Sequence, residues 1–505
     1  MTLTRTGRET LAVAALAALW LAATAWTRPL MLPDEGRYVG VAWEMLRSGN
    51  WLTPTLDGLP YFHKPPLFYW ITAAAMSVFG RHEWAARAAP LLGAWLGAMA
   101  LYLFVRRWWG ERAARFSLLA LLVQPLFYVG AQFANLDMLV AGCIVATITL
   151  LAHAALSIEQ GLPYRAALLA AYAAAAIGVL AKGLIGALLP ALVVGSWLLA
   201  LRRWRTLPAL LWWPGPLLFM LLAAPWFGAM QQRFDGFLDY FFIVQHFKRF
   251  AEAGFNNVQP FWFYPAVLFV FSLPWLPWLY KPFERGALAD PERGPLRLLM
   301  LLWVAMVVLF FSLPRSKLLG YVLPAVPPLA CLMADGYLTL DPSVQARRLW
   351  RLSAGITLAL GVGAVAALSL HPLRSSRELA AVLSAQRGAD EPVLMVENYA
   401  FDLPFYARLR EPVVVVDDWP AARADPRDTW RKELADAGRF APARAAALLV
   451  EPAALCTTQR SWVVGPSGAQ ARYPLLAHAV AVASHGDTTL WRVDATGCEG
   501  RPNAG

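Results

Sequence analysis

Residues 166–201 read AALLAAYAAAAIGVLAKGLIGALLPALVVGSWLLAL, and Lys182 is the only charged side chain among them. In lipid, a chain must satisfy its backbone polar groups internally, so a run of this kind predicts helices rather than loops. Because a helix needs about 17–25 apolar residues to cross a bilayer, the stretch is long enough to cross twice, with a turn near Lys182. It predicts an integral membrane protein.

The same pattern recurs along the first 370 residues. The chain is 58% hydrophobic and only 15% charged, against about 45–50% and about 25% in ordinary soluble domains. No small-residue cleavage site follows the first run, so we expect a span there rather than a cleaved signal peptide. Eleven apolar runs are present, at 11–27, 88–105, 116–130, 138–156, 166–181, 184–201, 207–227, 260–280, 298–313, 318–334 and 352–370.

Basic residues in the connections predict the orientation of these spans. With the N-terminus placed inside, the inside connections carry 17 Lys and Arg in 64 residues, and the short outside connections carry 11 in 101. This asymmetry favours an inside N-terminus in a bacterial inner membrane. The segment after the last span then lies on the outer, periplasmic side.

The net charge of +11 does not indicate a nucleic-acid partner. Arginine pairs occur at the ends of the spans, as at Arg106–Arg107, Arg202–Arg203 and Arg347–Arg348, where membrane topology explains them. The sequence contains no recognisable nucleic-acid-binding module, so we expect membrane lipid and no nucleic acid among its partners.

Two segments outside the spans are long enough to be structured. In 28–84 we expect helices at 36–46 and 67–79, the second too short to span and suited to the membrane surface. Residues 372–505 predict a soluble α/β domain, with a helix at 378–386 and strands at 393–396, 413–416, 446–450 and 490–493. The predicted domains are therefore 1–371, which contains the spans, and 372–505. The second domain contains Cys456 and Cys498, and the sequence does not decide whether they form a disulfide.

The strongest local signal is Pro33-Asp34-Glu35-Gly36-Arg37-Tyr38, just beyond the first span. Adjacent carboxylates and an arginine at a membrane surface need partners or water. A solvated helix N-terminus would explain them, with Asp34 as its cap; a catalytic site is the alternative. We take Asp34 and Glu35 as catalytic candidates.

Other charged and polar side chains are expected at the same membrane level. Together they would suit a phosphate-bearing lipid, although each alone fits ordinary topology, such as a lysine that reaches up to the headgroups. His63 and His246 are the candidate metal ligands, from separate loops, and no metal-site spacing supports them. The further candidates are Asp137 as a second catalytic acid and Tyr38, Arg37, Tyr61, Lys64, Lys182, Arg249, Lys317 and Tyr321 as substrate-binding residues.

The first outside segment resembles the corresponding loop of bacterial aminoarabinose transferases, which belong with the protein O-mannosyltransferase-like members of the C-type membrane glycosyltransferases. The likeness continues more weakly to about residue 370. The motifs that carry it are Asp34-Glu35-x-Arg37-Tyr38, Trp43-Glu44-Met45-x-x-Ser48-Gly49-Asn50-Trp51, Tyr61-Phe62-x-Lys64-Pro65-Pro66-Leu67-x-Tyr69-Trp70, Asn135-x-Asp137, Lys182-Gly183, His246 and Lys317-x-x-x-Tyr321-x-Leu323-Pro324.

The resemblance implies about 11–13 spans, interfacial helices over a cavity, and a soluble outside domain. It implies that Asp34 is the catalytic carboxylate, that Asp137 is a second acid, and that Arg37, Lys64 and Arg249 hold a carrier phosphate. His246 matches a position associated with a divalent metal, but the usual carboxylate before Lys64 is replaced by His63. The implied reaction is inverting sugar transfer from an undecaprenyl-phosphate donor to lipid A.

Two alternatives remain open at the sequence level. The acceptor can instead be the Ser or Thr side chains of proteins. A lipid or ion transporter is a different class, and it predicts charges at mid-membrane and related halves. The charges here avoid the interiors of the spans, which favours the enzyme.

Overall fold

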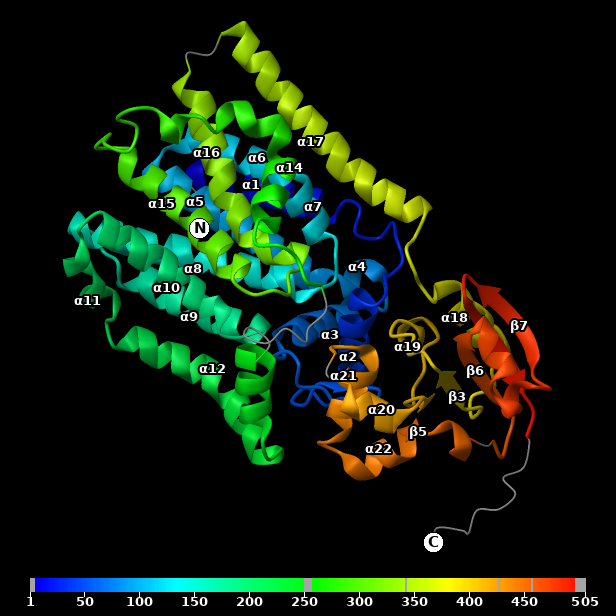
Figure 1. Ribbon diagram of the computed structural model, residues 1–505. Coiled ribbons are helices and arrows are strands. Elements are labelled where there is room, and N and C mark those ends of the chain that lie inside the picture. The colour runs from blue at the N-terminus through cyan, green and yellow to red at the C-terminus, as the bar shows by residue number, and fades with distance from the viewer. Residues whose placement is uncertain (1–4, 249–256, 341–342, 426, 456, 496–505) are drawn as a thin grey trace.

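The computed structural model describes residues 5–248, 257–340, 343–425, 427–455 and 457–495. A bundle of helices forms the larger part of the molecule, and a small sheet domain from the C-terminal quarter lies beside one end of it (Figure 1). The predicted mainly α, multi-span fold with a C-terminal α/β region is confirmed. The boundary between residues 371 and 372 stays a prediction, although α17 (Val344–Leu370) ends there.

Six helices in the described part are long and apolar enough to cross a membrane, or up to eight if each bent pair is one span. The bent pairs are α6 (Glu111–Val123) with α7 (Pro125–Ala131), at 67°, and Trp204–Leu210 with α12 (Pro214–Arg233), at 53°. Three predicted runs coincide with α1 (Arg5–Ala22), α10 (Ile185–Ala200) and the Phe263–Trp278 segment that begins with α14. The six single helices are α5 (Ala88–Trp108), α8 (Leu136–Glu159), α9 (Arg165–Lys182), α15 (Gly294–Ser312), Leu319–Thr339, which contains α16 (Val326–Thr339), and α17.

Glycines allow the central helices to approach closely. A Cβ atom built on Gly142 of α8 would lie 2.0 Å from the carbonyl oxygen of Gly93 on α5, and one on Gly186 would lie 2.3 Å from the carbonyl carbon of Gly178. Small residues at such crossings let the backbones touch, which supplies the packing that lipid cannot drive by hydrophobicity. α8 is buried along most of its length and forms the centre of the bundle.

The first loop contains both helices predicted from its sequence. α2 (Asp34–Ser48) and α3 (Leu67–Phe79) pack against each other and flank a two-stranded hairpin of β1 (Thr55–Leu56) and β2 (Leu59–Pro60). Asp57 and Gly58 turn the hairpin at φ of 52° and 72°, the left-handed backbone that Asp-Gly favours in a two-residue turn. Their position at the membrane surface stays a prediction.

The C-terminal sheet has the strand order β5-β4-β3-β6-β8-β7. The neighbouring strands β5, β4, β3 and β6 pair in parallel, β8 pairs antiparallel with β6, and β7 pairs antiparallel with β8. β3 is buried throughout, as a central parallel strand should be. The strands are β3 (Val393–Val396), β4 (Val414–Val416), β5 (Leu449–Val450), β6 (Ser461–Pro466), β7 (Val480–His485) and β8 (Thr488–Val493), and the helices are α18 (Arg377–Gln386), α19 (Leu403–Tyr406), α20 (Trp419–Ala424), α21 (Trp430–Gly438) and α22 (Pro442–Leu448).

One strand prediction is mostly wrong. Residues 446–450 were expected to be a strand, but α22 runs through Leu448 and only Leu449–Val450 is extended. Pro442 starts the helix with a preset φ, and the alanines that follow favour it. β6 and β7 were not predicted. The cysteines 456 and 498, whose pairing was left open, lie outside the described residues.

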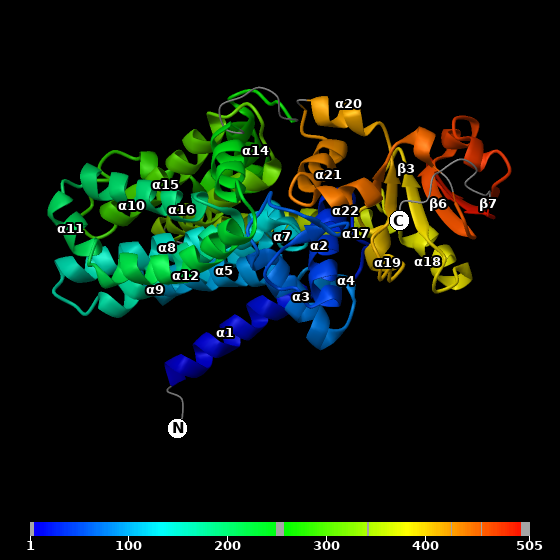
Figure 2. The same cartoon turned by 90° about the horizontal axis from the view of Figure 1, so that it is seen from below.

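The sheet domain contacts the first loop through α19 and α21 (Figure 2). A Cβ atom on Gly36 would lie 2.8 Å from the backbone nitrogen of Asp402, so α2 and the domain meet at backbone distance. The Asp57 carboxylate accepts a hydrogen bond of 2.9 Å from the Val413 amide. This contact brings residues of the C-terminal domain to the first turn of α2.

Candidate active site

The first turn of α2 presents Asp34 and Arg37 together. The Asp34 carboxylate pairs with the Arg37 guanidinium, and the same guanidinium also pairs with Glu433 of α21. The Asp34 side chain keeps 31% of its surface exposed, whereas the Glu433 side chain keeps 4%. Asp34 is therefore both held by a cation and open to a substrate.

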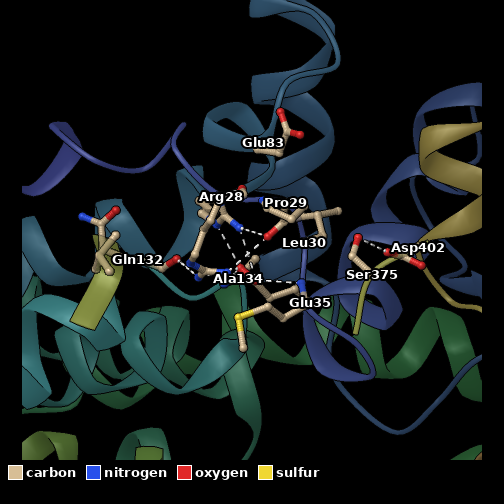
Figure 3. Close-up of polar contacts among 12 residues, drawn as sticks. Arg28, Pro29, Leu30, Glu35, Glu83, Gln132, Ala134, Ser375 and Asp402 are labelled. Carbon is tan, nitrogen blue, oxygen red and sulfur yellow. Dashed lines mark hydrogen bonds and ion pairs between the residues drawn. The ribbon is translucent and has the colours of Figure 1, made fainter. Parts of the chain in front are cut away.

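Glu35 points the other way, into the protein (Figure 3). Its carboxylate pairs with Arg28 and Arg87 and also accepts from the Met31 and Ala134 amides, at 3.0 and 2.8 Å. Burial raises the pKa of Glu35, but the charges of Arg87 and Arg28 outweigh it and lower the pKa to about 2. A fully buried, fully bonded carboxylate cannot reach a substrate, so we assign Glu35 a structural role in place of the predicted catalytic one.

Asp137 and Lys182 form a second ion pair, between the start of α8 and the end of α9. The Lys182 ammonium lies 4.1 Å from the centre of the Tyr321 ring. Gly320 makes this approach possible, since a Cβ atom there would lie 2.2 Å from an Asp137 carboxylate oxygen. Three predicted site residues from distant parts of the sequence thus meet.

Tyr38 lies beside the first ion pair, with its ring centre 5.4 Å from the Arg37 guanidinium. Burial raises the pKa of the Tyr38 hydroxyl well above its ordinary value, Arg37 opposes that rise, and the charges of both Asp34 and Asp137 add to it. Both carboxylates therefore lie close enough to act on one hydroxyl group. Tyr69 of α3 also belongs here: its pKa is raised by burial and affected by Arg37 and Glu433, and its buried hydroxyl has no hydrogen-bond partner among the described residues.

His63 lies against Tyr61 and Tyr240, two residues from different elements. Its ring stacks on Tyr61 at 4.7 Å, and its Nε2 is 2.8 Å from the hydroxyl of Tyr240, in the π-helical segment η2 (Asp239–Lys248). His63, Asp428 and Glu433 each offer one ligand atom, and these atoms lie within 4.8 Å of one another. An imidazole with two carboxylates is a donor set that a zinc-like ion accepts, so these residues fit a divalent metal.

Of the remaining candidate site residues, some are described by the structure and others are not. Lys64 is partly exposed beside His63. Lys317 is buried, and its ammonium donates to the backbone oxygens of Gln259 and Pro314, at 2.9 and 2.5 Å. Arg249 and the side chain of His246 lie outside the described residues, so the predicted His63–His246 metal pair stays a prediction.

Sequence reasoning missed the contribution of the C-terminal domain. Glu433 lies 396 positions beyond Arg37 and Asp428 lies 365 positions beyond His63, and no local pattern marks them. No unpaired charge in the sequence pointed to them, because Arg37 already has Asp34 and Glu35 as sequence neighbours. A helix with acids on one face, such as 430–438, was the place to look.

Comparison with known proteins gives consistent results. The sequence model of the dolichyl-phosphate-mannose-protein mannosyltransferase family matches residues 63–228. The undecaprenyl phosphate-alpha-4-amino-4-deoxy-L-arabinose arabinosyl transferase of Pectobacterium carotovorum subsp. carotovorum (strain PC1) is 33% identical over 353 residues, 68% of this chain and 62% of that protein. The protein of that name from Edwardsiella ictaluri (strain 93-146) is 32% identical, over 70% of this chain and 65% of its own.

Among solved structures, the crystal structure of ArnT from Cupriavidus metallidurans bound to undecaprenyl phosphate superimposes with a TM-score of 0.82. It is 25% identical, and the match covers 98% of this chain and 99% of that one. The chain is aminoarabinose transferase-like and has the C-type membrane glycosyltransferase fold.

This aminoarabinose transferase-like chain spans less than two thirds of the length of the curated relatives it matches, 62% and 65% for the two named above. The match to the mannosyltransferase family includes Lys64, Asp137 and Lys182 but begins after Asp34.

Proposed function

We propose that the protein transfers a sugar, 4-amino-4-deoxy-L-arabinose or another amino sugar, from undecaprenyl phosphate to lipid A. The observation that carries the proposal is the pairing of a partly exposed carboxylate, Asp34, with a largely enclosed guanidinium, Arg37, together with a second acid–base pair. Relatives named as undecaprenyl-phosphate aminoarabinose transferases support the choice of donor and sugar.

In this proposal the donor phosphate is bound by cations of the first loop. Arg37 offers a planar fork of donors suited to phosphate, and Lys64 adds a second charge next to His63. As the bond between the anomeric carbon and the phosphate oxygen breaks, negative charge grows on the departing lipid phosphate. Fixed cations stabilise that charge without reorganising.

Asp34 is proposed to act as the general base. It would accept the proton of the acceptor hydroxyl or phosphate as that oxygen bonds to the anomeric carbon, within hydrogen-bond reach. Direct displacement inverts the anomeric centre. Asp137, held by Lys182 near Tyr38, would orient the sugar or acceptor.

A divalent ion held by His63, Asp428 and Glu433 would tie the C-terminal domain to the first loop and supply a local positive charge. Its ligands come from both parts of the chain. No step of the proposed transfer runs through it.

The proposed setting is the periplasmic face of a bacterial inner membrane. There, an amino sugar on a lipid A phosphate would offset negative charge on lipopolysaccharide and weaken the binding of cationic antibiotics such as polymyxin. The basic residues at the inner ends of the spans support this orientation.

The decisive experiment measures the mass of lipid A when this protein is expressed in a strain that lacks such an enzyme. We expect added mass equal to one or two amino sugars with the native chain and none with Asp34→Asn, while both express equally. Asp235→Asn, at an exposed turn, is the matched control. Normal modification by Asp34→Asn would refute the assigned base.

Protein O-glycosylation is the second candidate, because the matching family is described as a protein mannosyltransferase family. Analysis of proteins and of lipid A from the same cells distinguishes a protein acceptor from a lipid A acceptor. Sugar found on periplasmic or outer-membrane proteins, with lipid A unmodified, would favour a protein acceptor.

A further inference from the structure

A hollow of about 460 Å³ lies between the turn that follows α3 and the helices α18 and α19 of the C-terminal domain. It does not include Asp34, Asp137 or the residues around them. Three arginines line it. Its lining residues are Arg81, Ala381, Ser384, Arg387, Tyr406, Ala407 and Arg408.

Arg81 is held firmly in the wall of the hollow. Its guanidinium donates to the backbone oxygens of Phe405 and Tyr406, the latter at 3.1 Å, and lies over the rings of Phe405 and Trp43 at 5.1 and 6.0 Å. Arg387 is fixed in the same way, with its Nε 2.6 Å from the Glu391 carbonyl oxygen. These side chains are positioned before any ligand arrives.

Within the described part of the chain, Arg81, Arg387 and Arg408 form no ion pair. Glu83 pairs instead with Arg377 at 3.5 Å, and Glu391 and Asp390 act on Arg387 only through their charge. Burial lowers the pKa of Arg81, and the charge of Arg408 lowers it further, against the opposing charge of Glu83. An anion between these arginines would remove that repulsion.

The segment that carries Arg81 suits a membrane surface. Val78 and Phe79, at the end of α3, leave 73% and 56% of their surfaces exposed, and Trp84 is also exposed. Arg81 lies between them in sequence. Exposed apolar and tryptophan side chains next to arginines are typical of the level at which lipid headgroups lie.

We propose that this hollow binds the phosphate group of an anionic membrane lipid, held between the guanidinium groups of Arg81, Arg387 and Arg408. Arginine forks match the geometry of phosphate oxygens, and the exposed apolar side chains that flank Arg81 in sequence are suited to contact acyl chains that remain in the bilayer. The Tyr406 hydroxyl, which accepts from the Leu30 amide at 2.7 Å, separates the site from the segment before Asp34.

The test uses the full-length protein in neutral detergent, with calorimetric titration of three probes: dihexanoyl phosphatidic acid, dihexanoyl phosphatidylcholine and inorganic phosphate. We expect phosphatidic acid to bind more tightly than the other two. Arg387→Gln with Arg408→Gln should weaken it at least tenfold. The charge-matched control is Arg410→Gln with Arg439→Gln, two exposed arginines outside the hollow.

Each result decides the proposal. Equal binding of inorganic phosphate and phosphatidic acid would overturn the lipid assignment and leave a free-phosphate site. Equal binding of phosphatidylcholine would show that the acyl chains, not the charge, drive association. Unchanged affinity in the Arg387/Arg408 variant, with an unchanged melting temperature, would refute the site.

Discussion

At the scale of single residues, Asp34 and Glu35 show how far neighbouring side chains can diverge. One helical step turns Glu35 by about 100° from Asp34, so one carboxylate faces the site and the other faces the protein interior. Asp34 pairs with Arg37 and stays partly exposed, and Glu35 is enclosed by Arg28 and Arg87. The sequence could locate the pair of acids but could not assign their roles, because this depends on which face of α2 is covered.

Glu35→Gln should destabilise the protein rather than alter its chemistry. The substitution leaves the buried guanidinium groups of Arg28 and Arg87 without a counter-charge, and breaking a buried pair in this way costs about 3–5 kcal/mol. We expect a marked fall in melting temperature in detergent, with little change for Glu411→Gln, whose side chain is exposed. An unchanged melting temperature would show that the Glu35 ion pairs do not stabilise the first loop.

The lowered pKa of the Glu35 carboxylate should make the stability of the protein depend on pH. Its folded pKa is about 2, below the ordinary value of 4.5, so the native state binds fewer protons than the unfolded state between these values. Its contribution is complete above about pH 4.5 and is lost as the pH falls towards 2. The native chain should therefore lose more stability on acidification than Glu35→Gln, as measured by melting temperature across that range.

At the scale of elements, a glycine determines how closely the segment before α16 approaches α8. Gly320→Ala should disturb the Asp137–Lys182 pair, because the new methyl group would overlap the Asp137 carboxylate. We expect transfer to fall at least tenfold with expression retained. The control is Gly363→Ala on α17, where no atom lies within 4 Å of an added Cβ. Full activity in Gly320→Ala would contradict the role proposed for this close contact.

Elements with a strong periodic signal were predicted well, and those without one were not. α2, α3 and β3 lie where the sequence placed them, since apolar runs and turn residues mark their ends. Residues 446–450 combine alanines, which favour the helix that Pro442 starts, with aliphatic side chains that suit a strand, so the apolar run alone did not distinguish the two. β7, at an exposed edge, begins with Val-Ala-Val-Ala and lacks the apolar–polar alternation that marks a half-buried strand.

At the scale of the whole molecule, the candidate site is assembled from both parts of the chain. Arg37 lies on the first loop, and its second partner, Glu433, lies 396 residues later on α21. Such a contact follows from the docking of the C-terminal domain against α2, which no single stretch of sequence encodes. The membrane part of the site was predictable from its motifs, and the part supplied by α21 was not.

This docking predicts that Glu433 positions Arg37 for the donor phosphate. Glu433→Gln would leave Arg37 with Asp34 as its single carboxylate partner among the described residues. The guanidinium would then turn towards Asp34, the proposed general base, and away from the donor phosphate. Hydrogen bonds between charged groups contribute about 1.5–3 kcal/mol, and we expect kcat/KM to fall about tenfold or more, mainly through a higher KM for the undecaprenyl-phosphate donor. Glu433→Asp keeps the charge and should recover part of the lost kcat/KM. If α21 has a purely structural role, both variants would instead have a lower melting temperature and an unchanged KM.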